Sequence, residues 1–185
     1  NSKFTGTTNI YDGKLYLGNE DGNTDNLNIL GGKVNVLSGG TLGGYGAFSG
    51  IVDVDGTLSI GDNGGSLVFL DQLNLKATSK AIFDFNNMGS LNPDDNAQDT
   101  AVFVDQLNID GASLETRVAG AGIYILFLYN SPSYGTQFSD ETVVSTKPDF
   151  DIGSASVGYD IPQSIYLKVL GAGQTMQFWD GTKMS

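Results

Sequence analysis

Carboxylate, tyrosine, lysine and hydroxyl side chains are the groups of this chain that could do chemistry. The 185 residues include no cysteine and no histidine. Thiol nucleophiles, disulfides, cysteine-based metal sites and every histidine-dependent triad are therefore excluded. A catalytic site would have to rely on acidic residues, as the paired carboxylates of glycoside hydrolases do.

One pair of acids with a catalytic spacing lies in IVDVDGTL, residues 51–58. In a strand, Asp53 and Asp55 would share one face with their Cα atoms about 7 Å apart. Glycosidase carboxylates have a similar separation, so a carbohydrate-active β-helical enzyme using this pair is one alternative. The segment also matches the first motif of haloacid-dehalogenase-type phosphatases, but no helices follow it, and GDNGG (61–65) comes too soon to be the later acidic motif. In a purely structural interpretation, Val52 and Val54 point inward and both aspartates face solvent.

Other candidate sites are weaker. The acidic segments 19–26 (NEDGNTDN) and 92–99 (NPDDNAQD) could offer oxygen ligands to calcium, but neither has the spacing of an EF-hand or of the β-roll nonapeptide. We expect polar loops there, and we assign no catalytic residue, no metal and no cofactor. Tyr11, Tyr16 and Tyr45 would form a contact strip for a partner or glycan only if they align on successive coils.

The charge balance argues against nucleic acid as a partner. The chain carries 21 acidic and nine basic residues, a net charge of −12. Duplex binding requires clustered lysine and arginine, which the sequence lacks. No apolar run approaches the roughly 20 residues of a membrane-spanning helix. Because the sequence starts at Asn1 instead of methionine, we expect a fragment of a longer protein.

The elements that would position these groups are strands. Apolar residues alternate with polar ones in several runs, such as Val34 and Val36 or Leu58 and Ile60. A period of two indicates half-buried strands, with outward positions such as Asn35 and Ser59 polar. The longest apolar run, Ile123–Tyr129, suits a buried strand. No segment has a helical period, so we expect an all-β fold.

The strand-like runs also repeat. Similar phrases occur as GKLYL (13–17), GKVNV (32–36) and GTLSI (56–60), and as DNLNI (25–29), DQLNL (71–75) and DQLNI (105–109). The octets VFLDQLNL (68–75) and VFVDQLNI (102–109) agree at six of eight positions. Such repeats predict the stacked coils of a solenoid with loops of varying length. Five Asp-Gly pairs favour antiparallel hairpins instead, one of them around residue 12.

Two segments resemble the passenger-associated repeat of bacterial autotransporters, the type V secreted surface proteins. These are FTGTTNIYDGKLYLG (4–18) and LSGGTLGGYGAFSGIVDVDGTLSIGDNGGSL (37–67), the second departing from the family at Ser59-Ile60-Gly61, where Ser-Pro-Gly is frequent. The resemblance implies a right-handed parallel β-helix with irregular loops and a less regular C-terminal part. It also implies display outside the cell by a separate, covalently linked outer-membrane β-barrel.

The expected organisation follows from this resemblance. Residues 1–85 would form glycine-rich coils, 86–100 an exposed polar loop, 101–176 a continuation with a stabilising, autochaperone-like part, and 177–185 the start of a following passenger unit. The second half contains a denser set of aromatic residues, which suggests a larger core: Phe127, Tyr129, Phe138, Phe150 and Tyr159.

The function expected for this segment is structural and adhesive. A non-enzymatic, monomeric stalk at the bacterial surface, or secreted after cleavage, would adhere to a host-cell or matrix protein or glycan, or to other bacteria. A released virulence effector that engages a host receptor is a further alternative.

Overall fold

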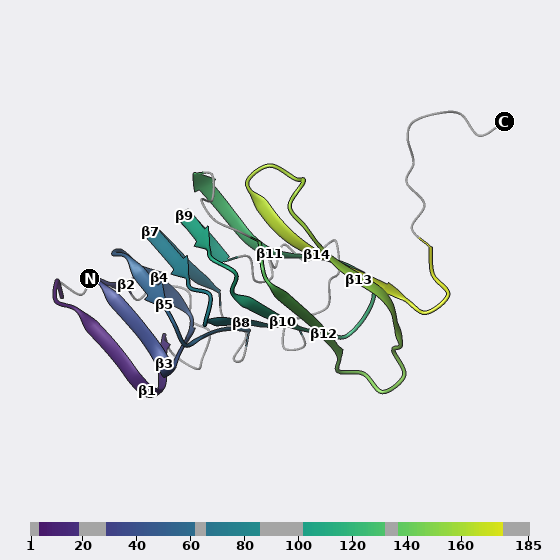
Figure 1. Ribbon diagram of the computed structural model, residues 1–185, viewed down its shortest axis with the longest axis horizontal. Coiled ribbons are helices and arrows are strands. Elements are labelled where there is room, and N and C mark those ends of the chain that lie inside the picture. The colour runs from purple at the N-terminus through teal and green to yellow at the C-terminus, as the bar shows by residue number, and fades with distance from the viewer. Residues whose placement is uncertain (1–3, 19–28, 62–65, 86–101, 132–136, 176–185) are drawn as a thin grey trace.

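The computed structural model describes residues 4–18, 29–61, 66–85, 102–131 and 137–175 (Figure 1). Within them the fold is all-β, which confirms the predicted fold class, and the strands form one mixed, nearly closed, barrel-like sheet. Among these residues there is no helix that could cross a membrane. The strands are β1 (Thr8–Leu17), β2 (Ile29–Leu30), β3 (Val34–Gly44), β4 (Gly46–Phe48), β5 (Val52–Val54), β6 (Thr57–Ile60), β7 (Leu67–Leu75), β8 (Lys80–Asp84), β9 (Val102–Ile109), β10 (Ser113–Val118), β11 (Gly122–Ser131), β12 (Asp140–Ser145), β13 (Ile152–Gly158) and β14 (Ser164–Gly171).

Most of the pairings are parallel and fall into three ladders. The first ladder runs through β1, β3, β5, β7 and β9. The second ladder runs through β1, β3, β6, β8, β10 and β12. The third ladder runs through β2, β4, β7, β9 and β11. Long strands such as β3 and β7 take part in two ladders, so the chain bends around the core from one ladder to the next.

The last strands close the sheet differently. β14 pairs antiparallel with both β11 and β13. The two ends of the strand order, β12 and β13, contact each other, and Glu141 hydrogen-bonds there to the Tyr159 hydroxyl and to the backbone of Val157. The Tyr159 hydroxyl also accepts a hydrogen bond from the backbone N–H of Phe138 at 3.2 Å.

One continuous hydrophobic core lies between the ladders. Aromatic pairs run through it: Phe48 stacks on Phe69 with ring centroids 5.2 Å apart, and Phe83 meets Phe127 edge-on at 5.2 Å. Of the aromatic residues noted in the second half, Phe127 and Phe138 are buried, and Tyr129, Phe150 and Tyr159 pack against the core.

Glycines allow the backbones to approach closely where the chain turns. Gly32 has φ +77°, and a Cβ there would collide with the carbonyl oxygen of Gly6. Gly44 has φ +98°, and its Cβ would collide with the carbonyl oxygen of Leu17. Any other residue would be strained at both positions and would separate neighbouring strands.

The predicted alternation is confirmed for Val34, Val36, Leu58 and Ile60, all of which are fully buried. Ser59 is buried as well, contrary to its expected outward exposure. Its register partner in β3 is Gly43, which has no side chain, and the ring of Tyr16 packs over that glycine.

The prediction of a buried strand at Ile123–Tyr129 is wrong for one of its faces. Ile123 and Ile125 are 55% and 41% exposed, whereas Tyr124 and Leu126 point into the core. The apolar run is therefore one strand with an apolar outer face, and periodicity cannot distinguish that from burial on both sides.

The hairpin predicted around residue 12 does not form. Residues 8–17 are a single strand, β1, that pairs in parallel with β3. The register shifts between Ile10 and Asp12, and Gly13 has φ +76° with its N–H bound to Asp12 Oδ1 at 2.8 Å. The Asp-Gly pair therefore lies within a continuous strand instead of reversing it, and the extra residue of the irregularity lies in β3, where Leu37 and Ser38 stand opposite Tyr11.

The repeated phrases do not all occupy equivalent places. GKLYL and GTLSI both pair with the second half of β3 in the second ladder. GKVNV instead supplies the first half of β3, in the first ladder. The phrase marks a glycine followed by a strand segment, and such segments occur in more than one ladder.

Candidate functional site

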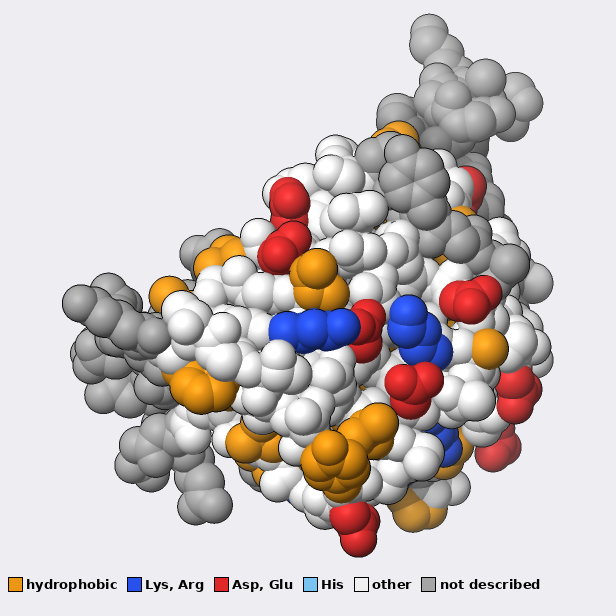
Figure 2. Space-filling view, turned by 60° about the vertical axis from the view of Figure 1, so that its left-hand side comes forward, with side chains coloured by type: hydrophobic (Ala, Val, Ile, Leu, Met, Phe, Trp, Pro, Cys, Tyr) orange, Lys and Arg blue, Asp and Glu red, His pale blue; other side chains and the backbone are white. Residues whose placement is uncertain are grey.

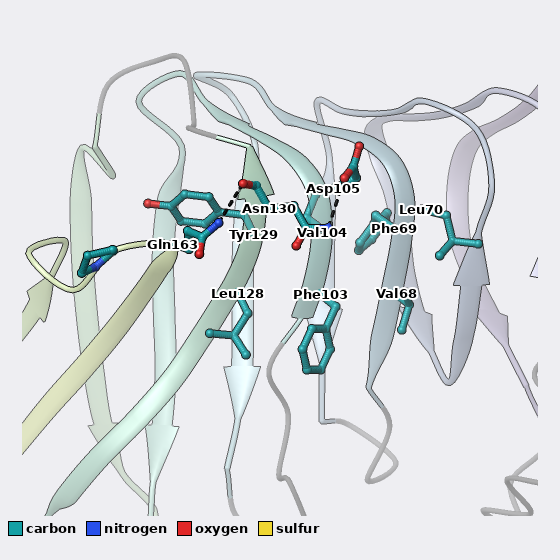
Figure 3. A pocket seen from close by; sticks show the side chains of 11 residues that line it. Val68, Phe69, Leu70, Phe103, Val104, Asp105, Leu128, Tyr129, Asn130 and Gln163 are labelled. Atoms are coloured by element: carbon teal, nitrogen blue, oxygen red, sulfur yellow. Dashed lines mark hydrogen bonds between the residues drawn. The ribbon is translucent and has the colours of Figure 1, made fainter.

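A groove on the outer surface of the third ladder is the candidate binding site, and it is termed the outer groove. Its floor consists of Val68, Phe103 and Leu128, and its polar rim of Asp105, Asn130 and Gln163. The groove is half-open and has a volume of about 440 Å³, within the range of small-molecule sites. Figure 3 shows the three floor side chains in one row across β7, β9 and β11, with Asp105 and Asn130 above them.

A bulge in β7 creates the floor. Aligning the two octets by sequence would place Phe69 beside Phe103, but the structure pairs Val68 with Phe103 and Phe69 with Val104. The extra residue lies between Phe69 and Gln72, where the register shifts. Because side chains alternate between faces, a slip of one residue reverses the face. Phe69 is therefore buried, whereas Phe103 is 41% exposed on the outer surface.

The sequence contains no signal for this groove. The octet repeat predicts that Phe103 occupies the same environment as Phe69, and its actual exposure follows from the bulge. Leu128 lies directly beside Phe103 in the register, inside the run that was expected to be buried. Val68, Phe103, Leu128 and the polar rim are accordingly residues that sequence reasoning missed.

Hydrogen bonds hold the polar rim in place. The Asn130 side-chain amide donates to Asp105 Oδ1 at 3.1 Å, and the Gln163 amide donates to the Asn130 carbonyl at 2.9 Å (Figure 3). The Tyr129 N–H donates to the Gln163 carbonyl at 3.0 Å. Gln163 has φ +60°, the one non-glycine residue with positive φ in the described part of the chain. Such a conformation persists only where neighbouring contacts hold it, and here the bonds to Asn130 and Tyr129 do so.

Asp53 lies on the outer side of the first ladder in a row of amide side chains. Its Oδ1 accepts a hydrogen bond from Asn74 at 2.7 Å, and Asn74 in turn accepts one from Asn108 at 2.7 Å. At the other end of the row, Asn35 donates to Asn9 at 2.7 Å. Register neighbours of one kind thus bond from strand to strand, forming an asparagine ladder that includes Asp53.

The ion pairs of Asp53 hold its carboxylate ionised and make it unsuited to act as a general acid. Lys33 Nζ lies 2.8 Å from Oδ2, and Lys76 Nζ lies 3.8 Å from Oδ1. Partial burial opposes ionisation, but the hydrogen bonds from Lys33 and Asn74 and the two ammonium groups outweigh it and lower the pKa of Asp53. A general acid needs a raised pKa. Asp55 accepts a long hydrogen bond, 3.4 Å, from Thr78, and the expected inward orientation of Val52 and Val54 is confirmed.

A second ionic cluster lies on the outer side of the second ladder. Glu115 receives Lys80 Nζ at 2.6 Å and Arg117 Nε at 2.8 Å, and Arg117 also lies 3.5 Å from Asp84. The bond from Lys80 is the main cause of the lowered pKa of Glu115. Figure 2 shows basic and acidic side chains side by side on the face it presents. Paired, partly exposed charges of this kind stabilise neighbouring strands weakly and leave no unpaired base for catalysis.

The tyrosines do not form the contact strip that alignment would have produced. Tyr11 and Tyr16 belong to the same strand, β1, and the register partner of Tyr16 is Gly43, two residues before Tyr45. The two segments considered as calcium ligands, 19–26 and 92–99, lie outside the described residues, as do the expected polar loop 86–100 and the expected start of a following unit at 177–185. Within the described ranges, no group of three or more acidic side chains is arranged to hold a metal ion.

Comparisons with known proteins do not assign the chain to a family. No family model matches it, and neither a curated protein nor a solved structure is significantly similar to it.

Proposed function

We propose that this chain is a non-enzymatic segment of an extracellular adhesive stalk, of the kind found in autotransporter passengers. In this proposal the three parallel ladders are the faces of a right-handed β-helix. Crossover connections between parallel strands of one sheet are almost always right-handed, which supports that hand. The segment would act at the bacterial surface or after release, and bind a host glycan or protein or other bacteria.

The observation that carries the proposal is the shared register of strands far apart in sequence. Inward apolar rows and the outward asparagine ladder both continue from strand to strand along the first ladder. Such an arrangement repeats along one axis, and each strand is stabilised mainly by its neighbours. A rod of this kind suits a stalk, because its length can grow without changing its cross-section.

The glycine turns and the outer ionic pairs support the same proposal. Gly32 and Gly44 allow successive backbones to approach closely, and the paired charges make the outer sides of the first and second ladders polar. The enzymatic alternative has less support, because Asp53 is held ionised between two lysines. The apolar floor and polar rim of the outer groove fit recognition better than catalysis.

The test is surface display in a Gram-negative host. The chain would be placed between a signal peptide and an autotransporter barrel, and adherence to epithelial cells, matrix proteins and sister cells would be measured. The control is the same barrel without the chain. We expect surface exposure and adherence well above the control, whereas retention inside the cell or adherence equal to the control would contradict the proposal.

A parallel assay addresses the enzymatic alternative. Purified chain would be incubated with a panel of polysaccharides, and the release of reducing ends compared between the wild type and Asp53→Asn. We expect no release by either. Hydrolysis that depends on Asp53 would overturn the non-enzymatic assignment.

A further inference from the structure

We infer that the outer groove binds a neutral sugar ring of a glycan, with Phe103 as the stacking platform. This inference rests on the proposed adhesive function and names the ligand class that the function requires. It concerns the floor residues Val68, Phe103 and Leu128 and the rim residues Asp105, Asn130 and Gln163.

The floor matches the apolar face of a pyranose. The ring of Phe103 is 41% exposed and lies between Val68 and Leu128, its register neighbours. The face of an aromatic ring carries negative charge density and attracts the weakly positive C–H groups that line one side of a sugar ring. Leu70, 52% exposed, extends the apolar surface beside the rim.

The rim matches the hydroxyl groups at the edge of the same sugar. A carboxylate has about four acceptor positions, and Asp105 receives one hydrogen bond from Asn130. The other acceptor positions of the Asp105 carboxylate are suited to sugar hydroxyls, which are good hydrogen-bond donors. The side-chain oxygens of Asn130 and Gln163 add acceptors on the same side, since the amide nitrogen of each is the group engaged in the rim.

The charge of the groove selects neutral sugars over acidic ones. Among the described residues that line it, Asp105 is the one charged residue, and no lysine or arginine is present. A carboxylated or sulfated sugar would be repelled by Asp105 and would find no counter-charge. A purely apolar peptide side chain would desolvate Asp105 and Asn130 without offering them hydrogen bonds.

The groove is also ordered before a ligand arrives. Asn130 joins Asp105 to Gln163, and Gln163 is held in its positive-φ conformation by bonds to Asn130 and Tyr129. Rim groups that are already fixed lose little conformational entropy on binding. Affinity can then arise from few contacts, as a half-open site requires.

The experiment is a saturation-transfer NMR titration of the purified chain with three sets of probes. The neutral set is cellotriose, chitotriose and lactose, the acidic set is trigalacturonate and sialyllactose, and the third set is a Leu-Phe-Leu tripeptide. We expect binding of at least one neutral sugar, with weaker or absent binding of the other two sets. Phe103→Ala should weaken that binding about tenfold, and Asn130→Ala about fivefold.

Matched variants keep the result interpretable. Tyr11→Ala removes a more exposed aromatic ring, 72%, far from the groove in the register and should leave binding unchanged. Phe103→Trp should preserve or strengthen binding, because it enlarges the platform. The circular dichroism spectrum and melting temperature of each variant would establish that it folds.

Three outcomes would overturn the inference. The first is that none of the neutral sugars binds at concentrations up to about 10 mM. The second is that the acidic sugars or the tripeptide bind more tightly than the neutral sugars. The third is that Phe103→Ala, in a folded variant, leaves neutral-sugar binding unchanged. The display assay separates this failure from that of the proposed function. If displayed Phe103→Ala still adheres as the wild type does, the stalk remains adhesive and the groove is not its ligand site.

Discussion

Replacing Thr116 with valine should stabilise the protein. Thr116 is fully buried in β10, and its register neighbours on either side are Phe83 and Val143. Its Oγ1 atom has no hydrogen-bond partner among the described residues. The unfolded chain would hydrate this hydroxyl, so folding leaves it desolvated without compensation.

The magnitude follows from the cost of an unsatisfied buried hydroxyl. That cost is about 1–3 kcal/mol, and valine replaces the hydroxyl with a methyl group of nearly the same size without loss of strand propensity. We expect Thr116→Val to raise the free energy of unfolding by about 1–2 kcal/mol. For a chain of this size the melting temperature should rise by about 2 to 8 °C.

Equilibrium urea unfolding would measure the change, with the slope of the transition checked for constancy. Thr116→Ser retains the hydroxyl and removes the methyl group, and should destabilise by about 1 kcal/mol. Thr142→Val, on the exposed face of β12, should change the stability by less than about 0.5 kcal/mol. A loss of stability in Thr116→Val would refute the reasoning, since it would mean that a buried water satisfies the hydroxyl.

Three further predictions concern the turns and the titrating groups. Gly32→Ala should lower the free energy of unfolding, measured in urea, by about 3 kcal/mol or more. At Gly13 a Cβ meets open space, so Gly13→Ala should cost only the backbone strain, about 1 kcal/mol. Equal losses of stability in the two variants would contradict the close approach at Gly32. Burial raises the pKa of Tyr159 to about 12, so ultraviolet titration should show a late tyrosine transition that Tyr159→Phe removes, and stability should decline as the pH rises from 10 through 12. Because their folded-state pKa values are lowered, Asp53 and Glu115 stabilise the protein at pH values above their ordinary pKa values of 3.8 and 4.5. Stability should fall as the pH drops through the folded-state pKa values. If an Asp53→Asn, Glu115→Gln double variant lost stability in acid as steeply as the wild type does, this would argue against the pairing.

The all-β fold class and much of the core could be predicted from sequence, because alternation reports directly on which face is buried. Val34, Val36, Leu58 and Ile60 are examples, each fully buried as expected. The repeat DQLNL/DQLNI also predicted a real neighbourhood, since Leu73 and Asn74 pair with Leu107 and Asn108. In these segments the local pattern and the long-range pairing agree.

The outer groove could not be predicted, because it depends on a register slip. Phe69 and Phe103 have the same place in their octets but opposite environments. The bulge that separates them has no distinctive residue, because Leu70 and Asp71 are matched by Val104 and Asp105 in the second octet. Likewise, the Asp12-Gly13 pair is compatible with a hairpin and with a continuous strand, and the parallel partner β3 decides between them.

The asparagine ladder has a consequence for how this chain tolerates insertions. Its bonded neighbours are 26, 21 and 34 residues apart in sequence, yet each pair meets in register. The alignment of two strands therefore does not depend on the number of residues that connect them. Lengthening a surface loop also costs little entropy. Insertions between strands should accumulate freely and diversify the exposed surface, whereas a single deletion inside β3, which belongs to two ladders, would misalign one of them. The loops are thus free to change in length and sequence while the strands remain fixed.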